Sequence, residues 1–335
     1  MEKSIKFIFL TLIVVSLFVG CSSPKTQKID FKNSELYIQN KTSISFANQS
    51  QGRRLLSKND EFLKVLSSFD MKSRMNIVDK EPMKDDFVKF ISEQVLEWNS
   101  DEIHKISLCA IKISKRFKHL NIKLTLPKEV IFIKTTGKEE GYSAYTRGNA
   151  IVLPQTEMKS SLEKLEVLIA HELFHIHTRN DFNSREYLHN ILGFKKCNDI
   201  IDELPKHLND YRITNPDSPQ NIFYKNVRKS GDIIKVIPIL FSRGDYKGGV
   251  FFKYISKKLI VVDGLSYNIK IVYDTKMPIL FGYEQVEGLY DEIGRDTNYN
   301  YHPEEVLAKY FEFLYLERNG LKDKFIVYEM KLLLK

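Results

Sequence analysis

The hydrophobic pattern is helical in the first half of the folded region and becomes strand-like later. Apolar residues recur at helical spacing from Asn59 to about Leu120. Three helices are predicted within this region, over Phe62–Phe69, Phe87–Trp98 and Ile103–Phe117. Two short runs rich in β-branched residues follow, EVIFIKTT (129–136) and NAIVLP (149–154), with the turn signal TRGN before the second. Both runs are predicted to be strands.

A second set of elements follows these strands. SSLEKLEVLIAHELFHIHT (160–178) predicts a helix, and Ser160 and Glu163 have the spacing of a capping box at its start. REYLHNILGF (185–194) predicts a shorter helix, and the alternating segment 222–283 predicts several antiparallel strands. HPEEVLAKYFEFLYLERNG (302–320) predicts a last helix, with proline near its start and glycine past its end. The order of elements predicts an α+β fold.

The N-terminus has the pattern of an export signal. Lys3 and Lys6 precede an apolar run from Phe7 to Val19, which is short for a transmembrane helix and typical of a signal peptide. FVGC, ending at Cys21, resembles the lipobox of bacterial lipoproteins, and this implies cleavage before Cys21 and diacylation of its thiol. We therefore expect a signal peptide over 1–20, a polar tether over 21–58 and a folded domain over 59–335.

Composition and charge limit the classes of partner that the protein is expected to have. Hydrophobic residues make up 43% of the chain, enough for a packed core, so a disordered protein is excluded. The net charge is +8, but 43 acidic residues are interspersed with the 51 basic ones, and no nucleic-acid motif is present. We expect a mixed solvated surface near an anionic membrane, and no nucleic-acid partner. Cys109 and Cys197 could form a disulfide in an exported protein or remain buried free thiols.

The motif HELFH places two histidines where they can share a metal ion. His171 and His175 are four residues apart, so on a helix both imidazoles project from one face and can bind one zinc ion at about 2.0–2.1 Å. Glu172 borders this face and can act as a base toward water, as in the HExxH arrangement of zinc metallopeptidases. His177 lies about 200° around the helix from His175 and is expected to be no ligand.

A third protein ligand is needed, and two layouts compete for it. Asp181, ten residues after His171, has the spacing of HExxHxxGxxH/D, but Thr178 stands where that layout uses a glycine. Alternatively, a glutamate from the late helix completes the site, because Glu304 and Glu305 follow Pro303 in its first turn. The helix dipole also favours carboxylates there without any metal.

The chain resembles the gluzincin peptidases, and within them an uncharacterised bacterial group. The segments AYTRGNAIVLP, LIAHELFHIHTR, REYLHNILGF and HPEEVLAKYF show the resemblance, which covers roughly residues 140 to 315. It implies a zincin-like fold, in which a small sheet lies over the active-site helix and an edge strand pairs antiparallel with the substrate. It favours Glu305 as third ligand, with Glu304 next, and implies a β-rich insertion at about 222–283. In thermolysin-like members an aspartate four residues after the ligand supports a histidine; Lys309 and Ala308 stand there instead.

These observations predict a membrane-anchored zinc metallopeptidase that hydrolyses peptides or proteins. His171, His175 and Glu305 bind zinc, Glu172 is the base, and Tyr301 or His302 donates a hydrogen bond to the developing oxyanion. The strand NAIVLP is expected to offer backbone groups to an extended peptide. The alternative is an envelope lipoprotein that keeps the zincin fold as a binding or structural module. The expected location is the cell envelope, and the outer membrane if the organism has two.

Overall fold

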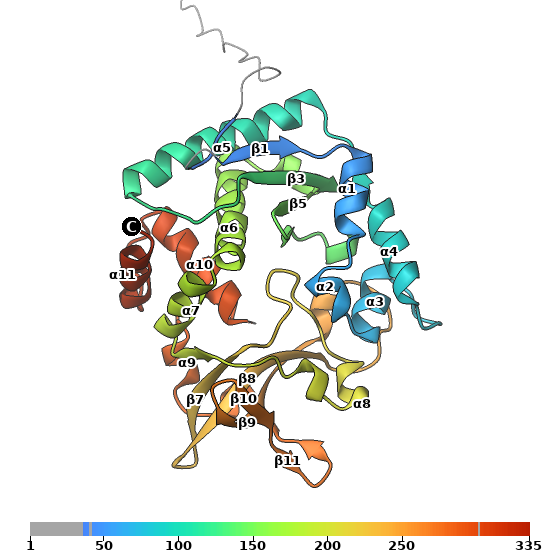
Figure 1. The fold of residues 1–335 in the computed structure, drawn as a ribbon, viewed down its shortest axis with the longest axis vertical. Helices are drawn as coiled ribbons and strands as arrows, with labels where there is room; N and C mark the ends of the chain where they lie inside the picture. The colour runs from blue at the N-terminus through green and yellow to red at the C-terminus, as the bar shows by residue number, and fades with distance from the viewer. Residues whose placement is uncertain (1–35, 40–41, 301) are drawn as a thin grey trace, which may run out of the picture. The chain divides into compact units, whose positions relative to one another are not determined.

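The computed structural model describes residues 36–39, 42–300 and 302–335, and they form a mixed α+β fold (Figure 1). The expected signal peptide, Cys21 and Tyr301 lie outside the described residues. Glu35–Lys335 forms one compact unit, and the β-rich segment 222–283 lies within it. Among the helices of the described ranges, none has the length and apolar character needed to cross a bilayer.

The first sheet is mainly parallel and has a short antiparallel edge strand. Its strands are β1 (Ser43–Phe46), β2 (Val95–Leu96), β3 (Glu129–Thr135), β4 (Tyr145–Arg147) and β5 (Ala150–Pro154). The order is β1-β3-β5-β4, with β2 pairing beside β1 on the same edge of β3. β1, β3 and β5 are parallel, whereas β4 pairs antiparallel with β5. Strand β5 is therefore internal, and β4 forms the edge.

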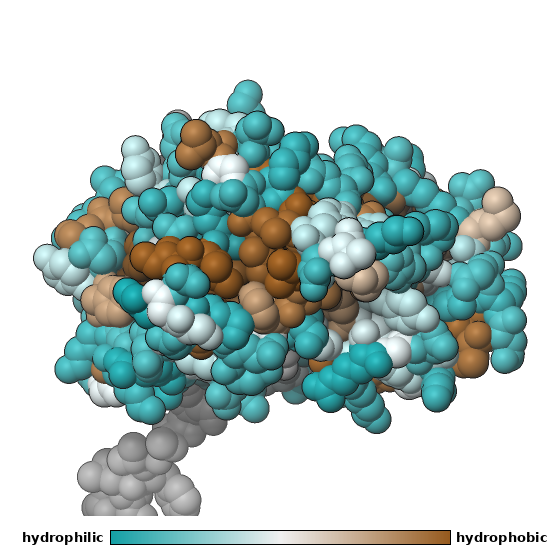
Figure 2. All heavy atoms as spheres, turned by 90° about the horizontal axis from the view of Figure 1, so that it is seen from below, coloured by the Kyte–Doolittle hydropathy of each residue, from teal (hydrophilic) through white to brown (hydrophobic). Residues whose placement is uncertain are grey.

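The second sheet is antiparallel and is built mostly from the segment expected to be β-rich. Its strands are β6 (Phe194–Lys196), β7 (Phe223–Lys229), β8 (Asp232–Ser242), β9 (Ile255–Leu265), β10 (Asn268–Ile271) and β13 (Leu280–Phe281). A separate hairpin joins β11 (Tyr273–Asp274) to β12 (Met277–Pro278). Seen from this end of the molecule, apolar side chains form a band within a polar rim (Figure 2). Inside the sheet the side chains alternate: Val236 and Leu259 belong to the main core, while Ile237 and Ile260 are buried in a separate cluster on the other face.

Helices cover the first sheet and connect it to the second. They are α1 (Gln49–Leu56), α2 (Glu61–Lys64), α3 (Ser68–Met75), α4 (Lys84–Glu93), α5 (Ser100–Leu120), α6 (Leu162–Asn180), α7 (Phe182–Ile191), α8 (Lys206–Asn209), α9 (Leu289–Glu292), α10 (Pro303–Tyr315) and α11 (Lys324–Leu333). Helix α6 is central, because it packs against α5, α7, α10 and strands β4 and β5 (Figure 1).

Some predicted helix boundaries are wrong for local reasons. The predicted helix over Phe62–Phe69 is two helices, because Asp60 caps α2 and Ser67 caps α3. The predicted helix over Phe87–Trp98 ends at Glu93, and the chain then enters β2. Helix α6 is capped by Ser161, whose side chain accepts from the backbone N–H of Lys164, and not by Ser160.

The expected tether also extends too far along the chain. Residues 43–56, placed in the tether over 21–58, contain β1 and α1, so the packed body begins earlier. β1 gains backbone hydrogen bonds by pairing with β3, which a polar sequence can form as well as an apolar one. Helix α1 approaches β2 closely at Gly52, where a Cβ would lie 2.7 Å from Val95 Cγ1. This close approach explains a glycine in the middle of a helix.

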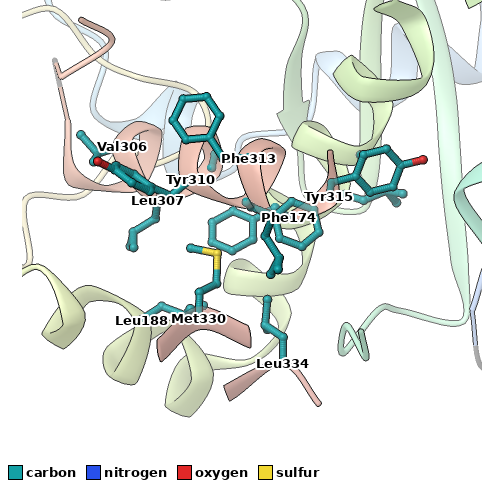
Figure 3. Close-up of a cluster of buried hydrophobic side chains, with 14 of the residues drawn as sticks. Phe174, Leu188, Val306, Leu307, Tyr310, Phe313, Tyr315, Met330 and Leu334 are labelled. Atoms are coloured by element: carbon teal, nitrogen blue, oxygen red, sulfur yellow. The ribbon is translucent and has the colours of Figure 1, made fainter. Parts of the chain in front are cut away.

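Helix α10 is held by a tightly packed apolar cluster. Phe311 stacks on Phe174 of α6 with ring centroids 5.1 Å apart, and Leu307 is fully buried. Figure 3 shows this cluster between α10, α7 and the C-terminal helix, with Leu188 and Met330 beneath Leu307. Packing of this density fixes the rotation of α10 relative to α6. The first turn of α10 is thereby placed beside the two histidines of α6.

The two described cysteines are buried free thiols in different core clusters. Cys109 lies on α5 in the main core, and Cys197 lies against the second sheet. Burial raises the pKa of each thiol to about 12, so both remain protonated and unreactive at neutral pH. Of the two possibilities left open by the sequence, the structure has the free thiols.

Candidate metal centre

Helix α6 presents two imidazoles on one face. His171 and His175 are one turn apart, and their Nε2 atoms lie 3.0 Å from each other. Both residues are buried, His175 completely. The helix is uninterrupted over this region, and its 19 residues are anchored on both sides by α5 and α10. The two nitrogens therefore have a fixed position and point at one spot.

Glu305, in the first turn of α10, reaches the same spot. Its Oε2 lies 3.5 Å from His171 Nε2 and 3.6 Å from His175 Nε2. Pro303 begins the helix, and the His302 ring accepts a hydrogen bond from the backbone N–H of Glu304 through Nδ1 at 3.2 Å. Proline and cap fix the first turn, and with it the direction of the Glu305 side chain.

These three atoms match the donor set of a transition-metal site. Tetrahedral ligands at zinc distances are about 3.3–3.6 Å apart, close to the 3.0, 3.5 and 3.6 Å measured between the three atoms. Two imidazole nitrogens and one carboxylate oxygen suit zinc and similar ions better than calcium or magnesium. His171, His175 and Glu305 thus form a group that could hold a metal ion.

The other candidates for third ligand have structural contacts elsewhere. Helix α6 continues to Asn180, so Asp181 lies past its end, where its carboxylate caps α7 by accepting from the backbone N–H of Ser184. Glu304 points to the far side of His175. His177, expected to be no ligand, accepts from the backbone N–H of Thr125 and contacts Ser184 Oγ at 2.9 Å.

Each histidine has a carboxylate behind it, which the sequence reasoning missed. Glu312 Oε1 lies 2.9 Å from His171 Nδ1, and Glu304 Oε1 lies 3.4 Å from His175 Nδ1. Such partners orient metal-binding imidazoles. Glu312 is seven residues after Glu305, which puts it on the same face two turns along α10. That spacing is present in the sequence, but the thermolysin-like pattern points to the position four residues on, where Lys309 instead bonds Glu312.

Glu304 is the centre of a buried polar network. Its Oε1 accepts from Thr178 Oγ1, and its Oε2 lies 3.4 Å from His189 Nε2 and 3.6 Å from Arg185 Nε. Burial alone would raise the pKa of Glu304, but the hydrogen bond to His175 and the nearby charges lower it well below its ordinary value. Glu304 is therefore an ionised buried group that holds His175 in place.

Glu172, which was expected to be the base, is not part of the group that could hold a metal. It is buried, and its Oε2 has no hydrogen-bond partner. It lines a cavity of about 340 Å³ together with His171, Glu305 and Asp217. Burial, joined by the negative charge of Asp217, raises the pKa of Glu172 to about 8. A carboxyl group with a raised pKa that opens on a cavity is suited to proton transfer.

His302 is a possible hydrogen-bond donor at the site. It lines a small, largely apolar pocket of about 60 Å³ with Glu305 and Tyr145. Burial lowers its pKa to about 4, so the ring is neutral at neutral pH. Because Nδ1 accepts from the Glu304 N–H, the proton of the neutral ring must be on Nε2. The oxyanion role predicted for His302 is compatible with this tautomer.

The expectation for the strand NAIVLP is wrong. β5 is paired with β3 on one side and, over residues 150–152, with β4 on the other, so it is not an edge strand along which a peptide could pair. The available edge is β4, and its Thr146 N–H donates to Asp217 Oδ1 at 2.7 Å. Asp217 belongs to the segment Asn215–Ser218, which the sequence analysis did not single out. Asn215 Nδ2 in turn donates to Glu305 Oε1 at 2.7 Å, so this segment also orients the third ligand.

We expect metal binding to release protons. Burial alone would lower the pKa of His171, but its hydrogen bonds to Glu305 and Glu312 raise it to about 9 in the metal-free chain, and the pKa of His175 is raised as well. A metal must displace these protons, so its apparent affinity should rise with pH up to about 9, with about one to two protons released per ion at neutral pH. Titration calorimetry in two buffers of different ionisation enthalpy measures the number of protons released. An observed binding enthalpy that is the same in both buffers would contradict the prediction.

Comparison with known proteins gives no indication of function, so the interpretation of the site depends on its geometry. No family model matches the chain, and neither a curated protein nor a solved structure matches it.

Proposed function

We propose that this chain is a zinc-dependent metallopeptidase with a zincin-like arrangement of sheet and active-site helix. The observation that supports the proposal most directly is the convergence of His171 Nε2, His175 Nε2 and Glu305 Oε2, with each histidine backed by a carboxylate. Glu172 lies beside this group with a buried oxygen that lacks a partner. Structural ion-pair networks seldom combine an unpartnered carboxylate, a cavity and a complete ligand set.

The reaction follows from the roles available to these side chains. A zinc ion at this site would polarise the scissile carbonyl and lower the pKa of water. Glu172 accepts the proton of the attacking water and delivers it to the leaving amine. His302 Nε2–H donates to the developing negative charge on the carbonyl oxygen. Strand β4 and the adjoining cavity give an extended peptide a place to lie beside Glu172.

The location proposed for the enzyme rests on the sequence. A lipid on Cys21 would anchor the folded unit to a membrane of the cell envelope, and the polar residues after Cys21 would separate the two. Peptides or proteins of the envelope are then the substrates, and zinc is the cofactor.

The metal content of the purified protein tests the proposal. We expect about one zinc ion per chain by elemental mass spectrometry, and loss of that zinc in His171→Ala and in Glu305→Ala. His119→Ala is the matched control, because this histidine is exposed on α5 and should leave the zinc content unchanged. Zinc content that is equal in all four proteins would contradict the site. Stoichiometric zinc without cleavage of any peptide in a broad library would favour the alternative, a non-catalytic envelope lipoprotein.

A further inference from the structure

The carboxylate of Asp217 lies at the edge of the first sheet and has no role in the proposed reaction. Its Oδ1 accepts hydrogen bonds from both the backbone N–H and the hydroxyl of Thr146. This N–H points away from β5, so it is the group that an added strand would pair with. Asp217 therefore stands where the carbonyl oxygen of a bound peptide would otherwise be.

This carboxylate is half-buried, and no cation of the described residues is bonded to it directly. Within the described ranges, no ion pair of 4.0 Å or less involves Asp217, although the charges of His175 and Arg179 act on it from a greater distance. The nearby Arg179 guanidinium donates instead to the backbone carbonyl of Asp217 and to Thr146 Oγ1. Asp217 and Glu172, whose Oε2 has no partner, line the same cavity. Asp217 thus lines the cavity without a cation of the chain bonded to its carboxylate, and a cationic ligand in the cavity could bond that carboxylate directly.

The segment around Asp217 also closes one end of the strand edge. Ser218 Oγ accepts from Arg185, and Asp217 N–H donates to Asn215 Oδ1. Arg179 additionally bonds the carbonyl of Gly148, just beyond β4. These contacts hold the segment across β4 at Thr146. A peptide that adds to this edge cannot continue past Thr146, so one of its ends must lie there.

The direction of the peptide determines which end it is. The cavity brings residues 142–144 beside His171 and Glu172, and Thr146 is two residues further along β4, about 6.6–6.8 Å away. A peptide that pairs antiparallel with β4 has its amino terminus toward Thr146 and its later residues toward 142–144. Its first or second peptide bond then lies beside Glu172.

We propose that Asp217 binds the free α-ammonium group of a peptide, and that the enzyme removes residues from the amino terminus. This inference rests on the proposed peptidase function and names its substrate class. The α-ammonium is favoured over a lysine side chain because Asp217 is bonded to a main-chain N–H, at the level of the substrate backbone. Side chains of a paired strand project above and below the sheet instead.

Binding to an inactive variant tests the proposal without relying on turnover. The probe is a tetrapeptide with a free amino terminus and one internal lysine, compared with its N-acetylated form, both titrated into zinc-loaded Glu172→Gln. We expect the free peptide to bind roughly 10- to 100-fold more tightly, as for a buried charge-assisted hydrogen bond. Adding Asp217→Asn, which keeps an acceptor for Thr146, should remove this preference. Glu157→Gln, which neutralises another carboxylate of the same cavity, should keep it.

Analysis of the products formed by the unsubstituted enzyme distinguishes the proposal from the alternatives. Stepwise loss of amino-terminal residues, blocked by acetylation, supports the proposal. Equal affinity for the two peptides, or internal cleavage of acetylated peptides at the same rate, overturns it. Higher activity of Asp217→Asn on every peptide also overturns it, because the segment Asn215–Ser218 would then only obstruct the binding of peptides to β4. Tight binding of the free peptide without any turnover upholds the role of Asp217 and refutes the proposed peptidase function alone.

Discussion

We expect Glu172→Gln to reduce peptide hydrolysis by about 10²–10⁴-fold while zinc remains bound. Glutamine has the same shape as glutamate but cannot accept the proton of the attacking water. The zinc ligands are His171, His175 and Glu305, so the substitution removes none of them. The measurement is kcat/KM on a quenched peptide, together with the zinc content of each protein.

A matched control separates this effect from a general loss of charge on α6. Glu163→Gln makes the same substitution in the first turn of the same helix, where the side chain is exposed, and should leave kcat/KM unchanged. Folding should tolerate Glu172→Gln, because a neutral amide at a buried position without a partner costs no more than a carboxylate there. If Glu172→Gln keeps its zinc and more than about a tenth of the activity, Glu172 is not the general base.

Local signals in the sequence were sufficient for the elements that form the site. The helical pattern that places His171 and His175 on one face corresponds to α6, and Pro303 begins α10 as expected. Both signals depend on residues close together in the chain. The same local reasoning misplaced the start of the folded body, since β1 is stabilised by pairing with β3, some 86 residues away.

The contacts missed by sequence reasoning are long-range ones. Glu312 and Glu304 reach α6 only because Phe311 and Leu307 fix the rotation of α10. Asp217 lies at β4 because Arg179 and Arg185 hold its segment there, and no periodicity in TNPDSP indicates this. Similarly, β5 could not be recognised as internal before its neighbours were known. Sequence patterns predicted which residues share a face, and tertiary packing decided what that face meets.

We expect the two carboxylates behind the histidines to differ in what they stabilise. Glu312→Gln should weaken zinc binding by about 10–100-fold, because it removes the acceptor that orients His171. The loss of stability should be small, since Lys309 is partly exposed and His171, the other cationic neighbour of Glu312 in the metal-free chain, keeps Glu305 as a partner. Glu304→Gln should weaken zinc binding similarly and also lower the free energy of unfolding by about 3–5 kcal/mol. The reason is Arg185, a buried cation whose carboxylate partner is then lost.

Two measurements on the same proteins separate the effects. Competition with a zinc chelator gives the affinity, and urea unfolding of the metal-free chain gives the stability without any contribution from bound metal. Glu166→Gln is a suitable control, because this residue of α6 pairs with Lys112 and Tyr315 away from the histidines. Wild-type zinc affinity in both Glu304→Gln and Glu312→Gln would mean that neither carboxylate orients its histidine. A metal-free Glu304→Gln chain as stable as the wild type would mean that Arg185 finds another acceptor.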